Sequence, residues 1–196
     1  MDKLLIATNN SGKLKEIKAL LASLEIELIA PAAINLHLDV KETGTTYTQN
    51  AALKAQAYAQ ASGLAALADD SGLEVDALDG EPGLYSARYA PQPDATDADR
   101  RAYLLEQLAP HPRPWTARFR CVVALAHSGQ DPTFATGTCP GEIIPEERGK
   151  QGFGYDPVFL VLDRGRTMAE LSMDEKNQIS HRARAIQAII PALKQV

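Results

Sequence analysis

The first thirty residues alternate between apolar runs and polar turns. Residues 4–7 are apolar, residues 8–12 are polar, and apolar positions then recur at helical spacing from Leu14 onward. A second apolar run over 26–30 is stopped by Pro31. The pattern predicts a strand, a loop, a helix and a second strand, which is an α/β beginning.

The next segment repeats this alternation. An alanine-rich helix is predicted over 48–62, with Gly63 in the position that often terminates a helix in the left-handed conformation. A short buried strand over 64–68 is then expected to end at the polar run Asp69-Asp70-Ser71-Gly72.

The second half of the chain is rich in extended segments. Residues 85–94 are loop-like, and a helix capped by Thr96 is predicted to run to about Ala109. The extended runs 115–127 and 133–144 are joined by a short polar turn, which predicts an antiparallel hairpin, and a further strand is expected over 158–162.

The last element is predicted as one long helix. It begins with a capping box, Ser172 and Glu175, and continues with apolar residues on one face. His181 and Arg182 lie off this apolar stripe, so they are not expected to face the core. Helices, short strands and a hairpin together predict an α/β fold with a mixed twisted sheet and flanking helices.

Charge and composition exclude several classes of protein. Basic residues number 20 and acidic residues 25, so the net charge of -5 disfavours a protein that coats nucleic acid. The longest apolar runs are far shorter than the roughly 20 residues of a membrane span, and no targeting segment is evident. We therefore expect a cytoplasmic protein with no membrane or direct nucleic-acid partner. The two cysteines, Cys121 and Cys139, have no metal-binding spacing and are expected to be buried thiols.

The polar loop at 8–13 could bind an anion, because it follows a strand and opens a helix. Backbone N–H groups at a helix N-terminus favour negative charge, and Lys13 adds a positive one. The segment is not a P-loop, since Ala7 stands where the first glycine is required and Leu14 where a magnesium-binding hydroxyl is required. A plain strand-to-helix turn is the alternative interpretation.

The pair Asp69-Asp70 is the strongest candidate for a metal site. Adjacent carboxylates repel each other unless a cation or hydrogen-bond donors offset them, and Mg²⁺ takes one or two protein carboxylates together with phosphate oxygens. Neighbouring residues of a strand point to opposite faces, so only one of the pair need meet the metal. An Asp-rich turn that caps local backbone is the alternative.

Three further groups carry weaker signals. Lys54 shares a helix face with Asn50, and Phe153 lies between two glycines, where its ring could stack on a base. His181-Arg182 could donate hydrogen bonds to carbonyl or phosphate oxygens. Taken singly, each is also compatible with a solvated helix face or a core aromatic.

The ordered set of motifs is specific where the single motifs are not. The motifs in this sequence are Ala7-Thr8-Asn9-Asn10-Ser11-Gly12-Lys13, Ala68-Asp69-Asp70-Ser71-Gly72-Leu73, Pro82-Gly83-Leu84-Tyr85-Ser86-Ala87-Arg88, Gly152-Phe153-Gly154-Tyr155-Asp156-Pro157 and Ser180-His181-Arg182. This set resembles the inosine/xanthosine triphosphate pyrophosphatase family, also called XTP/dITP diphosphatases, over essentially the whole chain, with Asn9 standing where many members carry Gly.

The resemblance implies one domain over 1–196, with two lobes around a central cleft, that acts as a homodimer. It implies magnesium-dependent hydrolysis of ITP, dITP and XTP to the monophosphate and pyrophosphate, which removes them from the nucleotide pool. It assigns Glu42 and Asp70 to Mg²⁺ and Asp70 also to proton transfer. On chemical grounds either Asp69 or Asp70 could orient or deprotonate the attacking water. The implied substrate-binding residues are Thr8, Asn9, Asn10, Ser11, Gly12, Lys13, Lys54, Ser71, Phe153, Gly154, Tyr155, Asp156, Lys176, His181 and Arg182.

Two other functions stay open at the level of sequence. One is a pyrophosphatase of the same fold that prefers other modified or pyrimidine triphosphates. The other is a nucleotide-binding module without turnover, which the intact acidic residues Glu42, Asp69 and Asp70 disfavour.

Overall fold

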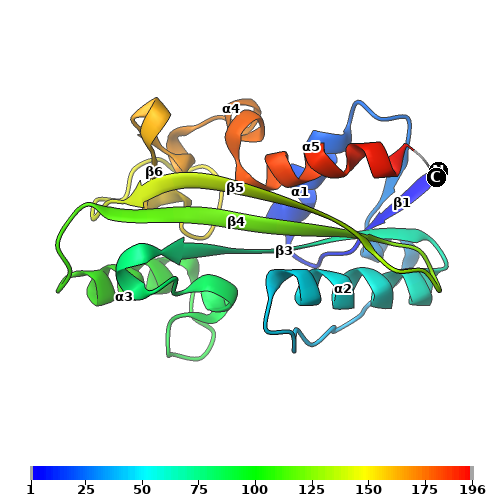
Figure 1. Ribbon diagram of the computed structural model, residues 1–196, viewed down its shortest axis with the longest axis horizontal. Coiled ribbons are helices and arrows are strands. Elements are labelled where there is room, and N and C mark those ends of the chain that lie inside the picture. The colour runs from blue at the N-terminus through cyan, green and yellow to red at the C-terminus, as the bar shows by residue number, and fades with distance from the viewer. Residues whose placement is uncertain (1, 195–196) are drawn as a thin grey trace. The chain divides into compact units, whose positions relative to one another are not determined.

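The computed structural model describes residues 2–194, and its seven strands form one sheet (Figure 1). The strands are β1 (Lys3–Ile6), β2 (Glu27–Ile29), β3 (Ala65–Val75), β4 (Trp115–Ala126), β5 (Thr133–Ile143), β6 (Phe159–Val161) and β7 (Arg166–Thr167). Their order is β2-β1-β3-β4-β5-β6-β7. Strand β1 pairs in parallel with β2 and β3, whereas β6 pairs antiparallel with β5 and β7. The prediction of a mixed sheet in an α/β fold is confirmed.

Five α-helices accompany the sheet among the described residues. They are α1 (Ser11–Leu21), α2 (Tyr47–Ser62), α3 (Asp97–Leu108), α4 (Met173–Ile179) and α5 (His181–Leu193). Their ends follow the expected local chemistry. Gly63 ends α2 with φ at 70°, and the side chains of Thr96 and Ser172 cap α3 and α4.

The chain divides into two compact units. The first comprises Met1–Asp70, Cys121–Gly137 and His181–Val196, and the second comprises Ser71–Arg120 and Thr138–Ser180.

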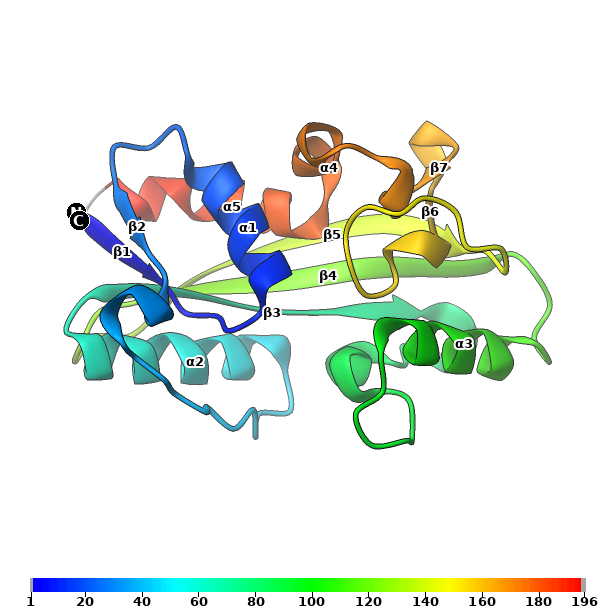
Figure 2. The ribbon, with the colours of Figure 1, turned by 180° about the vertical axis from the view of Figure 1, so that it is seen from behind.

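In the first unit, helices cover both faces of the strands. Helices α1 and α5 lie on one face and α2 lies on the other (Figures 1 and 2). Because side chains alternate along a strand, Leu4 and Ile6 of β1 pack toward α1 and α5, while Leu5 packs toward α2. The apolar side chains of β1 therefore pack against helices on both faces of the sheet.

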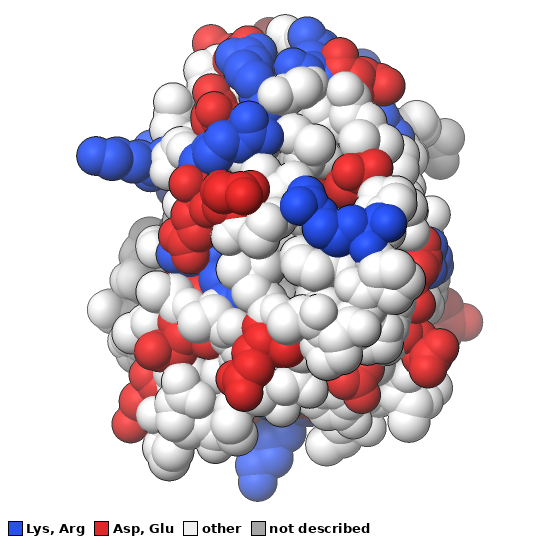
Figure 3. Space-filling model, turned by 90° about the vertical axis from the view of Figure 1, so that its left-hand side faces the viewer, with Lys and Arg blue, Asp and Glu red and all other residues white. Residues whose placement is uncertain are grey.

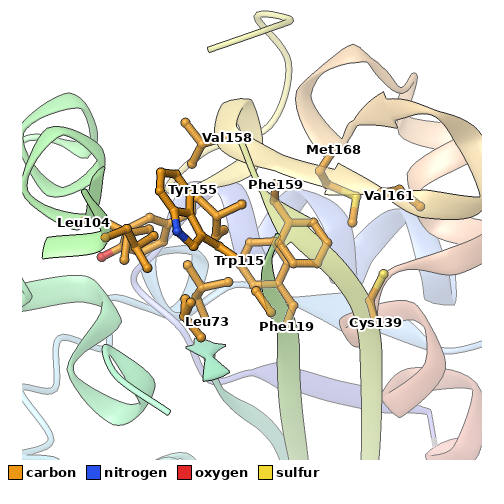
Figure 4. Packing of buried hydrophobic residues seen from close by; sticks show 14 of the residues in the cluster. Leu73, Leu104, Trp115, Phe119, Cys139, Tyr155, Val158, Phe159, Val161 and Met168 are labelled. Carbon is orange, nitrogen blue, oxygen red and sulfur yellow. The ribbon is translucent and has the colours of Figure 1, made fainter. Parts of the chain in front are cut away.

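The second unit has a core of its own (Figure 4). Trp115 and Phe119 of β4 and Phe159 of β6 contribute its large aromatic rings, and the rings of Phe119 and Phe159 lie 4.4 Å apart between centroids. Leu104 of α3 is fully buried against this cluster. Both cysteines of the chain are buried, as expected.

Two predicted boundaries were wrong. The strand expected to end at Ala68 runs on to Val75 and includes Asp69 and Asp70, because cationic and amide side chains offset both carboxylates. The segment expected as one terminal helix is two helices, since Ser180 is extended, with φ at -65° and ψ at 155°. The 3₁₀ helix Gly83–Arg88 overlaps the start of the segment 85–94 that was expected as loop.

The surface is of mixed charge on the face drawn in Figure 3. Acidic and basic side chains both lie on this face, and neither kind forms a continuous patch across it. Across residues 2–194, no helix is both long enough and apolar enough to span a membrane.

Candidate active site

Strand β3 directs its two adjacent carboxylates to opposite faces of the sheet. Asp69 follows the alternation that points Leu67 toward α1 and α5, and Asp70 follows the alternation that points Ala66 and Ala68 toward α2. Asp69 accordingly contacts Lys13, whereas Asp70 contacts side chains of α2. The strand geometry thus gives each carboxylate different neighbours.

Asp69 lies in a buried network of charges. Its Oδ2 accepts hydrogen bonds from Nε and Nη2 of Arg182 at 3.1 and 3.0 Å, and it lies 3.1 Å from Nζ of Lys13. The remaining terminal nitrogen of Arg182, Nη1, donates to Glu16 of α1. The thiol of Cys121 lies 3.9 Å from the same Asp69 oxygen.

These contacts determine the protonation states of the network. Burial alone would raise the pKa of Asp69, but the charges of Lys13 and Arg182 outweigh it and hold the pKa well below its usual range. Burial alone would lower the pKa of Arg182, and Asp69 and Glu16 raise it instead. Burial, assisted by Asp69, raises the pKa of Cys121 to about 12, so this thiol stays protonated at neutral pH. Asp69 is therefore a permanent anion engaged by two cations.

The expectation that His181 and Arg182 face away from the core was wrong. Their exposed fractions are 5% and 1%, and Arg182 is the largest fully buried side chain of the described residues. The prediction carried the apolar stripe of one continuous helix past Ser180, whereas the break at that residue resets the helical phase of α5. The approach of α5 to β5 also requires Gly137, because a Cβ there would lie 2.1 Å from the carbonyl oxygen of His181.

On the opposite face, Asp70 and Glu42 share a cation. Nζ of Lys54 lies 2.5 Å from Oε1 of Glu42 and 3.4 Å from Oδ1 of Asp70. Asn50, which is 1% exposed, donates from Nδ2 to Oδ2 of Asp70 at 3.2 Å. Its Oδ1 accepts from the backbone N–H of Gly44 at 2.8 Å, which ties the loop that carries Glu42 to α2. The carboxylates of Glu42 and Asp70 thereby converge on the ammonium of Lys54.

Burial and the charge of Glu42 raise the pKa of Asp70, although Lys54 and the hydrogen bond from Asn50 oppose the shift. Two carboxylates that converge on one cation form the oxygen donor set that Mg²⁺ prefers, with phosphate and water as the remaining ligands. The described residues contain no cluster of three or more His, Cys, Asp or Glu side chains suited to a metal. The pair Glu42 and Asp70 therefore fits a metal that is completed by substrate, and does not fit one enclosed by protein ligands.

The polar loop at 8–13 leads into α1 as predicted. Oδ1 of Asn10 accepts from the backbone N–H of Lys13 at 3.0 Å and caps the helix, and Oγ1 of Thr8 accepts from the N–H of Asn10 at 3.2 Å. Ser11 and Gly12 form the first turn. The loop is anchored to α2, because Oδ1 of Asn9 accepts from the hydroxyl of Tyr58 at 3.3 Å.

Three of the predicted nucleotide-binding residues of the second unit, Phe153, Asp156 and Lys176, contact one another. Oδ2 of Asp156 accepts from the backbone N–H of Phe153 at 3.0 Å and from Nζ of Lys176 at 2.6 Å. The Lys176 ammonium lies 5.2 Å from the centroid of the Phe153 ring, a cation–π contact. Gly152 is required here, since a Cβ would lie 1.9 Å from Oδ2 of Asp156. The glycine loop is thus held in shape by a buried ion pair.

The other predicted residues of this unit have structural contacts. Gly154 donates its N–H to Oδ2 of Asp97 at 2.7 Å, and the hydroxyl of Tyr155 donates to the carbonyl oxygen of Ser86 at 2.9 Å. Burial raises the pKa of Tyr155, so this hydroxyl remains a donor. Ser71 lies on β3 directly after Asp70.

Several residues of these networks were not predicted as site residues. Glu16 and Asn50 are polar and buried, and Gly44 and Gly137 allow close approaches that a Cβ would block. The sequence signal that could have indicated Glu16 and Asn50 is their spacing from the predicted lysines. Glu16 lies three residues after Lys13 on α1, and Asn50 lies four residues before Lys54 on α2. Spacing brings such pairs to one helix face but does not say that the face is buried.

Comparison with known proteins identifies the family. The model of the Ham1 family matches residues 4–192. The chain belongs to the Ham1 family.

Relatives of this family member span nearly its whole length. A protein of Oceanobacillus iheyensis named dITP/XTP pyrophosphatase is 47% identical, over 95% of each chain. One of Escherichia coli O157:H7 with the same name is 44% identical, over 99% of each chain. Among solved structures, a HAM1 protein from Coxiella burnetii is 44% identical and superimposes with a TM-score of 0.89 over 100% of both chains. The Ham1 protein of Staphylococcus aureus is 40% identical, with a TM-score of 0.86 over 99% of both chains.

Proposed function

We propose that this protein hydrolyses deaminated purine nucleoside triphosphates, ITP, dITP and XTP, to the monophosphate and pyrophosphate. Its relatives named dITP/XTP pyrophosphatase support the substrate class. The observation that carries the proposal is the convergence of Glu42 and Asp70 on the ammonium of Lys54, in the same unit as Lys13 at the N-terminus of α1. A triphosphate brings several negative charges, and this unit supplies cations and a metal-binding pair to offset them.

Glu42 and Asp70 would hold Mg²⁺, because they present carboxylate oxygens to one point. When bound, the metal would neutralise charge that develops on the phosphate oxygens during displacement. Lys54 contacts both carboxylates and would lie beside the metal and the phosphates. Asn50 would hold the two metal ligands in position relative to each other. It donates a hydrogen bond to Asp70, and it accepts one from the backbone of Gly44 in the loop that carries Glu42.

The loop at 8–13 would bind the triphosphate. The first turn of α1 presents backbone N–H groups, and Thr8, Asn9, Asn10 and Ser11 add polar side chains around them. Lys13 adds a cation whose position is set by Asp69. These groups would orient the α-phosphorus toward the attacking water, with pyrophosphate as the leaving group.

Asp70 is the better candidate for the proton acceptor. Oδ2 of Asp69 already receives two hydrogen bonds from Arg182 and the ammonium of Lys13, so Asp69 is held as a counter-ion. Asp70 has one hydrogen bond from Asn50 and a longer contact to Lys54. As water adds to the α-phosphorus and the bond to the β-phosphate oxygen breaks, Asp70 would take the water's proton.

Selection of the base would use hydrogen-bond donors. Hypoxanthine and xanthine present a carbonyl at position 6, where adenine presents an amino group. A site made of donors rejects the amino group, because donor then meets donor. Phe153, Lys176, His181 and Arg182 stay predicted nucleotide-binding residues, with Phe153 expected to stack on the base.

A panel of triphosphates tests the function. Pyrophosphate release in Mg²⁺ is measured with ITP, dITP, XTP, ATP, GTP and pyrimidine triphosphates, and we expect kcat/KM for the deaminated purines to exceed that for ATP by orders of magnitude. A preference for a pyrimidine or another modified triphosphate would favour the related-pyrophosphatase function. Tight ITP binding without pyrophosphate formation would favour a binding module. Omission of Mg²⁺ from the same panel tests the metal requirement.

We further propose that the protein acts as a homodimer in the cytoplasm, with no membrane or nucleic-acid partner. The family resemblance and the mixed charge of the sequence support this proposal. Light scattering coupled to gel filtration would test the dimer.

A further inference from the structure

We propose that Glu16 is a positioning residue for phosphate binding, because it holds Arg182 so that Asp69 can fix the ammonium of Lys13. The inference rests on the proposed function for the triphosphate.

Four charges of alternating sign form a series of contacts that begins and ends on α1. Glu16 of α1 accepts from Nη1 of Arg182, and Arg182 donates through Nε and Nη2 to Asp69 of β3. Asp69 in turn contacts Lys13, which lies one turn before Glu16 on α1. These contacts therefore connect α1 to α5, α5 to β3, and β3 back to α1.

The network is buried at the end where Glu16 lies and opens toward Lys13. Glu16 and Arg182 are 2% and 1% exposed, whereas the side chain of Lys13 is 16% exposed. A buried carboxylate is costly unless a cation and hydrogen bonds compensate it. Arg182 compensates the charge of Glu16 in a buried ion pair, so the placements of the two side chains depend on each other.

Arg182 and Lys13 share one oxygen atom, Oδ2 of Asp69. With Glu16 ionised, part of the charge of Arg182 is balanced from the other side, and Asp69 can attract Lys13 as well. Without the charge of Glu16, an unbalanced Arg182 faces the ammonium of Lys13 across that single oxygen. The flexible lysine would then be repelled toward solvent, and its fixed position at the N-terminus of α1 would be lost.

The experiment measures what Lys13 contributes to phosphate binding with and without Glu16. The dissociation constant for inorganic tripolyphosphate is determined by calorimetry for the wild type, Lys13→Met, Glu16→Gln and the double variant. A double-mutant cycle removes any general effect of the lost negative charge, since that effect is present in both Glu16→Gln proteins. Glu27→Gln is the matched control, because Glu27 is an exposed partner of Lys3 in the same unit.

We expect Lys13→Met to raise the dissociation constant at least about tenfold in the wild-type and Glu27→Gln backgrounds, as for a lost charge-assisted contact. In the Glu16→Gln background the same change should raise it less than about threefold. Should Glu16→Gln fail to fold, Glu16→Asp is measured in the same cycle, because the shorter side chain withdraws the carboxylate from Nη1 of Arg182, and the effect of Lys13→Met should again fall below about threefold. An equal effect of Lys13→Met in both backgrounds, including no effect in either, overturns the inference.

Hydrolysis of ITP by the wild-type preparation separates this inference from the proposed function. If ITP is hydrolysed and the cycle shows no coupling, only the role of Glu16 is wrong. If the cycle shows coupling and ITP is not hydrolysed, the role of Glu16 in phosphate binding stands and the proposed reaction is wrong.

Discussion

Asp69 and Asp70 are adjacent in the chain, but their carboxylates lie on opposite faces of β3 and have different partners. Asp69 contacts Arg182 and Lys13, and Asp70 contacts Asn50 and Lys54. The sheet therefore separates a carboxylate that organises cations from one available to a metal. This separation predicts that the two residues respond differently to the same substitution.

Asp70→Asn should lower kcat for ITP by at least about 10²-fold with little change in stability, because the proposed proton acceptor is lost. Asp69→Asn should instead reduce the free energy of unfolding by about 3–5 kcal/mol, since Arg182 would remain buried without its main counter-ion. Urea unfolding and steady-state kinetics of both variants provide the comparison. Equal losses of stability, or near-normal turnover by a folded Asp70→Asn protein, would contradict this assignment.

Asn50→Ala and Gly44→Ala should both weaken metal binding, because both disturb the link between Asp70 and the Glu42 loop. A Cβ on Gly44 would lie 2.7 Å from Oδ1 of Asn50, so the two variants reach the same contact from different sides. We expect the Mg²⁺ concentration for half-maximal activity to rise about tenfold. Mn²⁺ binding measured by electron paramagnetic resonance gives a readout independent of turnover. Gln60→Ala, on the exposed surface of α2, is the control, and unchanged metal affinity in both test variants would argue against the link.

Phe153→Ala should weaken binding of ITP and leave binding of tripolyphosphate unchanged. The loss expected for a base–aromatic stack is about 1–3 kcal/mol, or roughly 5- to 150-fold in the dissociation constant. Calorimetry with both ligands separates base binding from phosphate binding. Phe134→Ala, which removes an exposed ring elsewhere, serves as the control. If both ligands weaken alike, Phe153 supports the fold and does not stack on the base.

Gly137→Ala should destabilise the protein by about 1–3 kcal/mol or more, because the new Cβ would overlap the backbone of α5. The carbonyl oxygen of His181 is 2.1 Å from the position that this Cβ would occupy. Gly129→Ala is the matched control: its φ of +76° strains any other residue, but no atom lies within 4 Å. The control should lose about 1 kcal/mol. Urea midpoints measure both, and equal losses would mean that α5 yields to the added methyl group.

Much of the architecture follows from local patterns in the sequence. The apolar run of β1 and the cap residues Asn10, Thr96 and Ser172 act over a few residues, so a single sequence contains the information for them. The mixed sheet and the hairpin segments were predicted for the same reason. The ordered motifs also pointed to the family that the comparison identified.

Tertiary structure alone decided how the charged residues are used. Arg182 was expected at the surface because it lies off the apolar stripe of one continuous helix. The helix breaks at Ser180, so the stripe of the preceding segment does not say which side chains of α5 face the core. The pairing of Arg182 with Glu16 spans 166 residues of sequence, and its pairing with Asp69 spans 113. No local spacing encodes such contacts, because they arise only when α1, β3 and α5 pack together. The sequence thus identified Asp69 and Asp70 as an adjacent pair of carboxylates. Packing made Asp69 the counter-ion of Arg182 and Lys13, and placed Asp70 beside Lys54, which also contacts Glu42.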